Sequence, residues 1–244
     1  MASINIGTAG WSVPRAAAHA FPAEGSSLER YAARFPAAEV NSSFHRSHRK
    51  STWERWRDST PAHFRFSVKL PKLITHQMKL VDCAMALDAF LEEVAALRPK
   101  LAVLLVQLPP RLAFDAAIAR AFFAALAVRT DAALACEPRH LTWFTPEADD
   151  LLASFSTARV AADPAICAAA AQPGGHLALN YWRLHGSPVM YRSSYADRIA
   201  AYAALLAEAP GEERWCIFDN TASSAALADA LALGDAIGLP CQTA

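Results

Sequence analysis

The sequence lacks the hallmarks of a disulfide-stabilised, zinc-binding or nucleic-acid-binding protein. Its five cysteines are odd in number and widely spread, and no two of them form a Cys-x-x-Cys pair. This pattern argues against a disulfide framework and a zinc knuckle. Lys+Arg and Asp+Glu each total 23, so the net charge is zero. Because bulk electrostatic binding of DNA or RNA needs a basic excess, we expect no nucleic-acid partner.

The sequence also lacks a recognisable targeting or membrane-spanning segment. It begins Met-Ala-Ser-Ile-Asn-Ile-Gly, without the basic region and the apolar core of a secretory signal. No stretch of about 18 residues is both apolar and free of charge, as a spanning helix would be. We therefore predict a soluble, cytoplasmic protein that has no membrane partner. The oligomeric state stays open.

What the sequence does contain is a repeated pattern, in which an apolar segment ends at a polar or charged residue and an amphipathic segment follows. The apolar segments are residues 4–8, 37–42, 64–70, 101–108, 133–137, 158–162, 179–185 and 215–218. Buried parallel strands have this composition, and they deliver side chains to a site at their C-terminal ends. About eight such units are what a closed barrel requires. The sequence predicts an α/β fold over residues 1–244, a single (β/α)8 TIM-type barrel with parallel strands.

Several helix starts can be read from capping patterns between the apolar segments. Ser26 with Glu29 and Ser51 with Glu54 each fit a capping box, and these pairs predict two helix N-termini. Thr145 followed by a proline predicts a third start, since proline suits the first helical position. Residues 221–224 predict the start of the last helix.

The ends of the predicted strands carry the side chains on which a function would depend. Glu39 and Asn41 are two residues apart, as are Arg183 and His185, so each pair faces one side of its strand. Glu137 and Arg139 end the central strand in the same way. For Glu39 a buried structural ion pair remains an alternative. A core aromatic position is the alternative for Trp11.

These residue types favour acid–base chemistry on a small polar metabolite, possibly phosphorylated or otherwise anionic, in the barrel mouth. Glu137 or Glu39 is the candidate general base and His185 the candidate acid. Asp163 and Asp219 complete the candidate catalytic set. The candidate substrate-binding residues are Trp11, Asn41, Lys69, His76, Gln107, Arg139, Trp143, Arg183, Gly186, Tyr191 and Asn220. Gly186 and the helix start at residues 221–224 follow the two last strands, where barrels often bind phosphate through backbone N–H groups.

Two other classes of function remain open. The same acidic residues and His185 are suitable divalent-metal ligands for a metal-dependent hydrolase or a nucleic-acid-processing enzyme. No ligand-spaced motif supports that class, and we predict no resident cofactor or metal site. A non-catalytic module would instead stack a sugar or another small molecule on aromatic residues. The aromatic residues available for this are Trp11, Phe44, Trp143, Tyr191 and Tyr195.

A series of short motifs occurs along the chain in a fixed order. The motifs are Gly7-Thr8-Ala9-Gly10-Trp11, Glu39-Val40-Asn41-Ser42-Ser43-Phe44, Phe66-Ser67-Val68-Lys69-Leu70-Pro71 with Ile74-Thr75-His76, Gln107-Leu108-Pro109-Pro110, Glu137-Pro138-Arg139-His140 with Trp143, Arg183-Leu184-His185-Gly186, and Phe218-Asp219-Asn220. In this combination the chain resembles the YecE-like family, a bacterial and archaeal family of unknown function, from about residue 4 to about residue 237. The resemblance implies a TIM-barrel fold and implies no reaction.

Three positions depart from the pattern of that family. Ala9 stands where the family usually has serine, and residues 13–15 replace an aromatic stretch. Both changes fall at the mouth near the first strand. Asp219 stands where asparagine is common, which adds a carboxylate to the predicted site.

Overall fold

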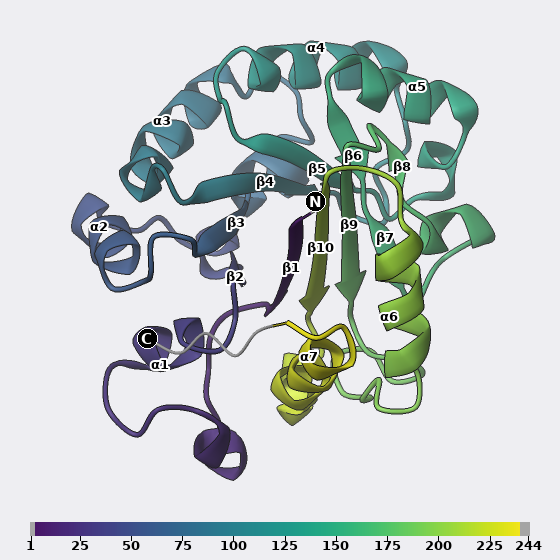
Figure 1. The fold of residues 1–244 in the computed structure, drawn as a ribbon. Coiled ribbons are helices and arrows are strands. Elements are labelled where there is room, and N and C mark those ends of the chain that lie inside the picture. Colours follow the sequence, from purple (N-terminus) through teal and green to yellow (C-terminus); the bar gives the residue numbers. More distant parts are fainter. Residues whose placement is uncertain (1–2, 240–244) are drawn as a thin grey trace.

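The computed structural model describes residues 3–239 and has strands at the centre with helices outside them (Figure 1). The strands are Ser3–Thr8 (β1), Ala37–Val40 (β2), Arg65–Lys69 (β3), Leu101–Gln107 (β4), Ala133–Glu137 (β5), Thr157–Arg159 (β6), Ala161–Asp163 (β7), Gly174–Gly175 (β8), Leu179–Leu184 (β9) and Glu213–Phe218 (β10). Each predicted apolar segment contains a strand, and the segment at 158–162 is divided between β6 and β7. The predicted α/β fold with mostly parallel strands is confirmed.

The strands pair into two sheets. One has the order β1-β10-β9-β7, and the other has the order β2-β3-β4-β5-β6-β8. All pairs are parallel except that of the short strand β8, which runs antiparallel to β6. An isolated parallel bridge between Ala9 and Glu39 links the β1 edge of the first sheet to the β2 edge of the second. At the other edge, the chain leaves β6 in one sheet and enters β7 in the other after a single residue.

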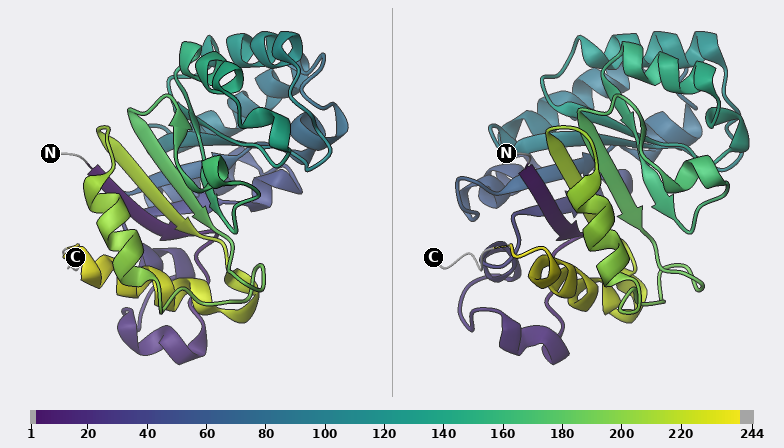
Figure 2. Two further views of the ribbon diagram at one scale, coloured as in Figure 1. Left: turned by 90° about the vertical axis from the view of Figure 1, so that its right-hand side faces the viewer. Right: turned by 45° about the vertical axis from the view of Figure 1, so that its right-hand side comes forward.

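Helices follow most of the strands and lie on the outside of both sheets (Figure 2). The α-helices are Ser27–Ala32 (α1), Lys50–Asp58 (α2), Ala84–Val94 (α3), Ala116–Ala127 (α4), Pro146–Ser154 (α5), Ile199–Glu208 (α6) and Ala225–Ala236 (α7). Short 3-10 turns occupy Arg15–Ala20, Ser42–Phe44, Ala95–Leu97, Leu141–Trp143, Ala168–Ala171 and Thr221–Ser223, and a π-helical turn occupies Leu73–Gln77. Within residues 3–239, no helix combines the length and apolarity needed to cross a membrane.

Local sequence signals account for some helix starts and fail at others. The capping box of Ser26 and Glu29 is formed at α1, and Thr145 caps α5 ahead of its proline. The second predicted capping box is wrong, because the N-cap of α2 is Arg49, two residues earlier, and Ser51 lies inside the helix. The last helix also starts later than predicted: a 3-10 turn precedes it, and Ser224 adopts a left-handed conformation with φ of 63°.

Two apolar clusters hold the fold together. The larger lies between strands and helices and includes Phe66, Leu184 and Phe218. The smaller lies on the opposite faces of the strands and includes Leu105 and Tyr181. Because side chains alternate across a strand, β2, β4, β5, β9 and β10 each contribute to both clusters. Further along the strands, towards their C-terminal ends, the side chains on the same face as the smaller cluster are polar, and they form the candidate site.

Candidate functional site

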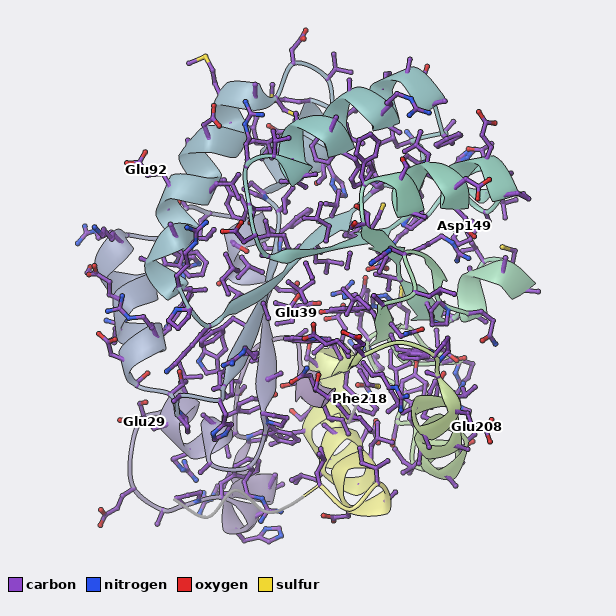
Figure 3. The ribbon with its side chains drawn as sticks, turned by 45° about the horizontal axis from the view of Figure 1, so that its top comes forward. Glu29, Glu39, Glu92, Asp149, Glu208 and Phe218 are labelled. Atoms are coloured by element: carbon purple, nitrogen blue, oxygen red, sulfur yellow. The ribbon has the colours of Figure 1, made fainter. Side chains whose placement is uncertain are left out.

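Arg183 is the central residue of a buried ionic network at the C-terminal ends of the strands. Its side chain is fully buried and makes a two-pronged contact with Glu39, with Nε–Oε2 and Nη2–Oε1 distances of 3.0 and 2.6 Å. It also donates to Glu137 at 2.5 Å and to Asp219 at 3.1 Å. Figure 3 shows Glu39 in the interior, with strands on either side of it. A buried guanidinium needs such carboxylate partners, because the desolvation cost is otherwise uncompensated.

His185, directly after the C-terminal end of β9, extends the network beyond the strand. Its Nε2 lies 2.9 Å from Glu137 Oε1, and its Nδ1 lies 3.0 Å from Asp219 Oδ2. Burial by itself lowers the pKa of His185, but the charge of Glu137 and the hydrogen bonds to both carboxylates outweigh it and raise the pKa. Two carboxylate neighbours require an N–H on each ring nitrogen, which only the imidazolium has. The Arg139 side chain lies 3.2 Å from the same Nε2 atom, so two cations are close together. Glu137 contacts both of them, and its negative charge offsets their repulsion.

The two carboxylates beside His185 are held in their ionised forms. Burial alone would raise the pKa of Glu137, but the charges of Arg183, Arg139 and His185 hold it well below its usual value. The pKa of Asp219 is lowered in the same way, since Arg183 and the His185 hydrogen bond outweigh its burial. Glu39 is fully buried, and its oxygens accept hydrogen bonds from Arg183 and Tyr181. None of the three is placed to act readily as a proton acceptor.

Lys69, at the end of β3, is a cation of a different kind. Its Nζ lies 4.2 Å from the centre of the Phe44 ring. Among the described residues it makes neither a hydrogen bond nor an ion pair. Burial, followed by the charge of Arg183, lowers the pKa of Lys69 to about 8, although Glu137, Glu39 and Asp219 act in the opposite direction. Lys69 therefore lies within the electrostatic field of the network without being bonded to it.

Two residues of the network, Tyr181 and Ser67, are absent from the sequence-based predictions. The Tyr181 hydroxyl donates to Glu39 or to the Ser67 hydroxyl, both 2.9 Å away. Tyr181 is two residues before Arg183, and Ser67 is two before Lys69. Residues two apart on a strand face the same side, and this rule predicts that Arg183 and His185 share a face. Applied one step earlier on each strand, the same rule identifies Tyr181 and Ser67.

Four more of the predicted residues lie at or beside this network. Asn41 donates to Asp219 at 3.4 Å, and its Oδ1 is buried with no partner among residues 3–239. His76 lies edge-on to Phe44 at 4.9 Å, and burial followed by the charge of Lys69 lowers its pKa. The Tyr191 ring is 6.0 Å from the His185 ring. Gln107 pairs in register with Glu137 and donates to the carbonyl of Leu108.

Asp163 does not join the network, which corrects its prediction as a catalytic residue. It pairs in register with Leu184, whose side chain belongs to the outer cluster, rather than with Arg183. Its carboxylate is bound by Tyr195, Arg198 and Tyr202 at 2.8 to 3.0 Å. Asp163 thus attaches α6 and the segment before it to the outer face of β7.

Two aromatic residues predicted to bind substrate make packing contacts in the structure. Trp143 is buried, donates to the Leu112 carbonyl at 3.0 Å and packs against Phe114. Trp11 packs edge-on against Trp56 at 4.9 Å and joins the outer cluster. Neither ring is directed into the network. The core alternative stated for Trp11 is the one that its contacts match.

The predicted backbone phosphate site and Asn220 are also occupied by internal contacts. The N–H of Gly186 donates to the Tyr195 hydroxyl at 2.8 Å and is not free for a ligand. Asn220 is buried and donates to the Ser193 carbonyl and to Asp229, at 2.9 and 2.7 Å. The turn before α7 consequently serves to fix the loop after β9.

The described residues offer no ready metal site. No group of three His, Cys, Asp or Glu side chains within 3–239 is arranged to hold a metal ion. The carboxylates of the network are directed at Arg183 and His185, whose charges would oppose a cation. The fit of these residues to a divalent metal is therefore poor.

Cavities outside the network itself include two of several hundred cubic ångströms. One, of about 520 Å³, lies at the opposite ends of the strands near Ala133 and Glu213 and contains none of the predicted site residues. The other, of about 480 Å³, borders the site, because Phe44 lines it together with Pro71 and Lys72. Its volume falls within the range of small-molecule pockets.

Comparison with known proteins gives a family and a fold. The model of the family described as "Protein of unknown function DUF72" matches residues 5–243. The UPF0759 protein YecE of Escherichia coli K12 is 33% identical over 106 residues, which cover 43% of this chain and 38% of YecE. The match thus spans about two fifths of that relative, and a second E. coli strain gives the same values.

Two solved structures share the fold at low sequence identity. A DUF72 family protein from Enterococcus faecalis superposes with a TM-score of 0.81 at 19% identity, covering 98% of this chain and 96% of its own. A DUF72 family protein from Thermotoga maritima gives 0.80 at 20% identity, covering 96% and 99%. At this identity the likeness bears on the fold alone.

Proposed function

This chain belongs to the DUF72 family, whose description names no activity, and we propose from its own residues that it is an enzyme acting on a small anionic metabolite. The metabolite binds where the strands end, and the reaction is a proton transfer to or from it. The observation that carries the proposal is Lys69, a half-buried cation whose ammonium bonds no acceptor among residues 3–239 and which lies beside a network of ionised groups.

The architecture we propose for the site is a closed (β/α)8 barrel in a single domain. Closure is supported at both sheet edges, by the bridge between Ala9 and Glu39 and by the direct passage from β6 to β7. It is also supported by Gly7, where a Cβ atom would come within 2.9 Å of the backbone carbonyl carbon of Ala37. In barrels of this type the active site lies at the C-terminal ends of the strands, where the network is found.

The charge of the site favours an anion. With His185 protonated, four cations surround three carboxylates; the cations are Arg183, Arg139, Lys69 and His185, and the carboxylates are Glu39, Glu137 and Asp219. The three carboxylates surround Arg183 and balance its charge. The positive charge left over is therefore carried by Lys69 and by the partly exposed Arg139. A carboxylate or phosphate group would complete the balance and remain hydrogen-bonded by both cations.

Proton transfer would use His185, whose pKa the neighbouring carboxylates raise, and Lys69, whose pKa is lowered to about 8. His185, as the imidazolium, is the acid, and Glu137 and Asp219 keep it charged and oriented. The base is Lys69, whose lowered pKa allows the neutral amine to exist near pH 8. Glu39 and Glu137 orient Arg183 in this scheme. The sequence-based hypothesis had assigned the role of base to one of these two glutamates.

The experiment is a ligand screen followed by a test for conversion. Thermal unfolding is measured against a panel of phosphorylated and carboxylated metabolites, and each metabolite that stabilises the protein is incubated with it and analysed by mass spectrometry. Lys69→Met should lose the stabilisation, whereas Lys72→Met, which removes an exposed lysine three residues away, should keep it. Stabilisation without conversion would indicate a binding module, and no stabilisation by any anion would refute the proposal.

A further inference from the structure

The five lysines of the chain provide an internal comparison. Lys50, Lys72 and Lys79 are exposed. Lys100 is buried, but its ammonium donates to three acceptors, the carbonyls of Arg57 and Thr60 and the Thr60 hydroxyl. These contacts are what a buried ammonium normally requires, because an unpaired charge in the interior is costly.

Lys69 differs from all of these. It is half-buried, and its Nζ faces the ring of Phe44 with no acceptor bonded to it among the described residues. A cation–π contact with phenylalanine compensates burial less well than hydrogen bonds do. Burial lowers the pKa of Lys100 as well, but three acceptors hold the Lys100 ammonium in place. The Lys69 amine has no bonded acceptor among the described residues, so its nitrogen is the better placed of the two to act as a nucleophile.

We propose that Lys69 forms an imine with the carbonyl carbon of an anionic aldehyde or ketone. This inference rests on the proposed function and specifies its substrate class. The carbonyl compound would place its carboxylate or phosphate towards Arg139, which has one carboxylate partner, Glu137, and is partly exposed. Its carbonyl carbon would approach Nζ from the side opposite Phe44.

The step balances without any further reactant. The lone pair of neutral Nζ attacks the carbonyl carbon, a C–N bond forms, and the carbonyl π electrons move to the oxygen, which takes up the proton that the nitrogen loses. His185 then protonates the hydroxyl group, which leaves as water and gives the protonated imine; return of the nitrogen's remaining proton to His185 gives the neutral imine. One amine and one carbonyl compound thus give one imine and one water.

The surroundings of Lys69 also suit the product. A protonated imine carries its positive charge where the ammonium charge had been, and Glu39, Glu137 and Asp219 each favour a cation at that position. Neutral amine for attack and stabilised cation afterwards are the two requirements of lysine-based carbonyl catalysis. Arg183, the largest opposing charge, is balanced by the same carboxylates.

The test is reductive trapping with glyoxylate, a small anionic aldehyde, in the presence of sodium borohydride. Peptide mapping of the intact protein measures the labelling rate at each of the five lysines. We expect Lys69 to react on the order of tenfold faster than the exposed lysines at pH 8, and its rate to rise with pH to a plateau above its pKa. Equal labelling of Lys69, Lys50, Lys72 and Lys79 would overturn the inference, and this comparison needs no variant.

Two variants separate this inference from the proposed function. Lys69→Arg keeps the positive charge but cannot form an imine, so it should lose trapping and retain stabilisation by anionic metabolites. Lys72→Arg is the matched control and should keep both. If anions stabilise the wild type but glyoxylate does not label Lys69 preferentially, the imine fails and the proposed function stands. If neither occurs, both fail.

Discussion

The guanidinium of Arg183 and the carboxylate of Glu39 face each other through two hydrogen bonds of 3.0 and 2.6 Å, although 144 residues separate them in the sequence. Arg183 belongs to β9 and Glu39 to β2, and these strands lie in different sheets. The pair therefore joins the two halves of the strand assembly at the place where the candidate site is formed. Folding and site formation depend on the same contact.

Replacing Arg183 tests this dependence. Arg183→Met should lower the free energy of unfolding by about 3 to 5 kcal/mol, because three carboxylates then lose their buried partner. Urea unfolding followed by fluorescence measures the change. Arg98→Met serves as the control, since the exposed side chain of Arg98 lies 4.0 Å from a fully exposed Asp131 and its loss should leave stability unchanged.

Asp219 should set the protonation of His185. Asp219→Asn removes a hydrogen-bonding carboxylate from Nδ1, so the pKa of His185 should fall. Because that pKa is raised in the folded protein, His185 stabilises the fold below its unfolded value of about 6.5, and this contribution is lost as pH rises through the folded pKa. Histidine NMR signals followed against pH give the pKa directly. An unchanged value in the variant would show that Glu137 alone controls the ring.

The sequence predicts the strands and most of the network, but not which strand-end residues face inward. Strand 158–162 is apolar on both faces, so its sequence gives no sign that Ala162 points inward and Asp163 outward. Glu137 and Asp163 look equivalent in the sequence, but Glu137 bonds Arg183, whereas Asp163 pairs in register with Leu184. The contact of Lys69 with Phe44 is equally hard to predict from the sequence, because Phe44 lies in a 3-10 turn that follows a different strand.

Asp163 should matter for stability and not for ligand binding. Asp163→Asn weakens the contacts to Arg198, Tyr195 and Tyr202, so the melting temperature should fall by several degrees. Stabilisation by any anionic metabolite found in the screen should persist in this variant. Loss of that stabilisation in a folded Asp163→Asn protein would indicate that Asp163 takes part in ligand binding.

Closure of the strand assembly can be probed at Gly7. A Cβ at this position would collide with the backbone carbonyl of Ala37 in β2, so Gly7→Ala should destabilise by about 1 to 3 kcal/mol. Gly234 is the matched control, because it lies in α7 and a Cβ there would meet only Leu239, at 3.9 Å. Gly234→Ala should stabilise by about 0.5 to 1 kcal/mol. Equal effects of the two changes in urea unfolding would argue that β1 and β2 are not in close contact.

The state of the Lys69 amine is the most direct test of the account as a whole. Labelling lysine Nζ with ¹⁵N and its neighbouring carbon with ¹³C gives five sites to follow by NMR across a pH titration. We predict one lysine with a pKa of about 8, whose signal disappears in Lys69→Arg. A Lys69 signal that titrates near 10.4, as exposed lysines do, would contradict the half-buried cation, without a bonded acceptor among residues 3–239, on which both proposals depend.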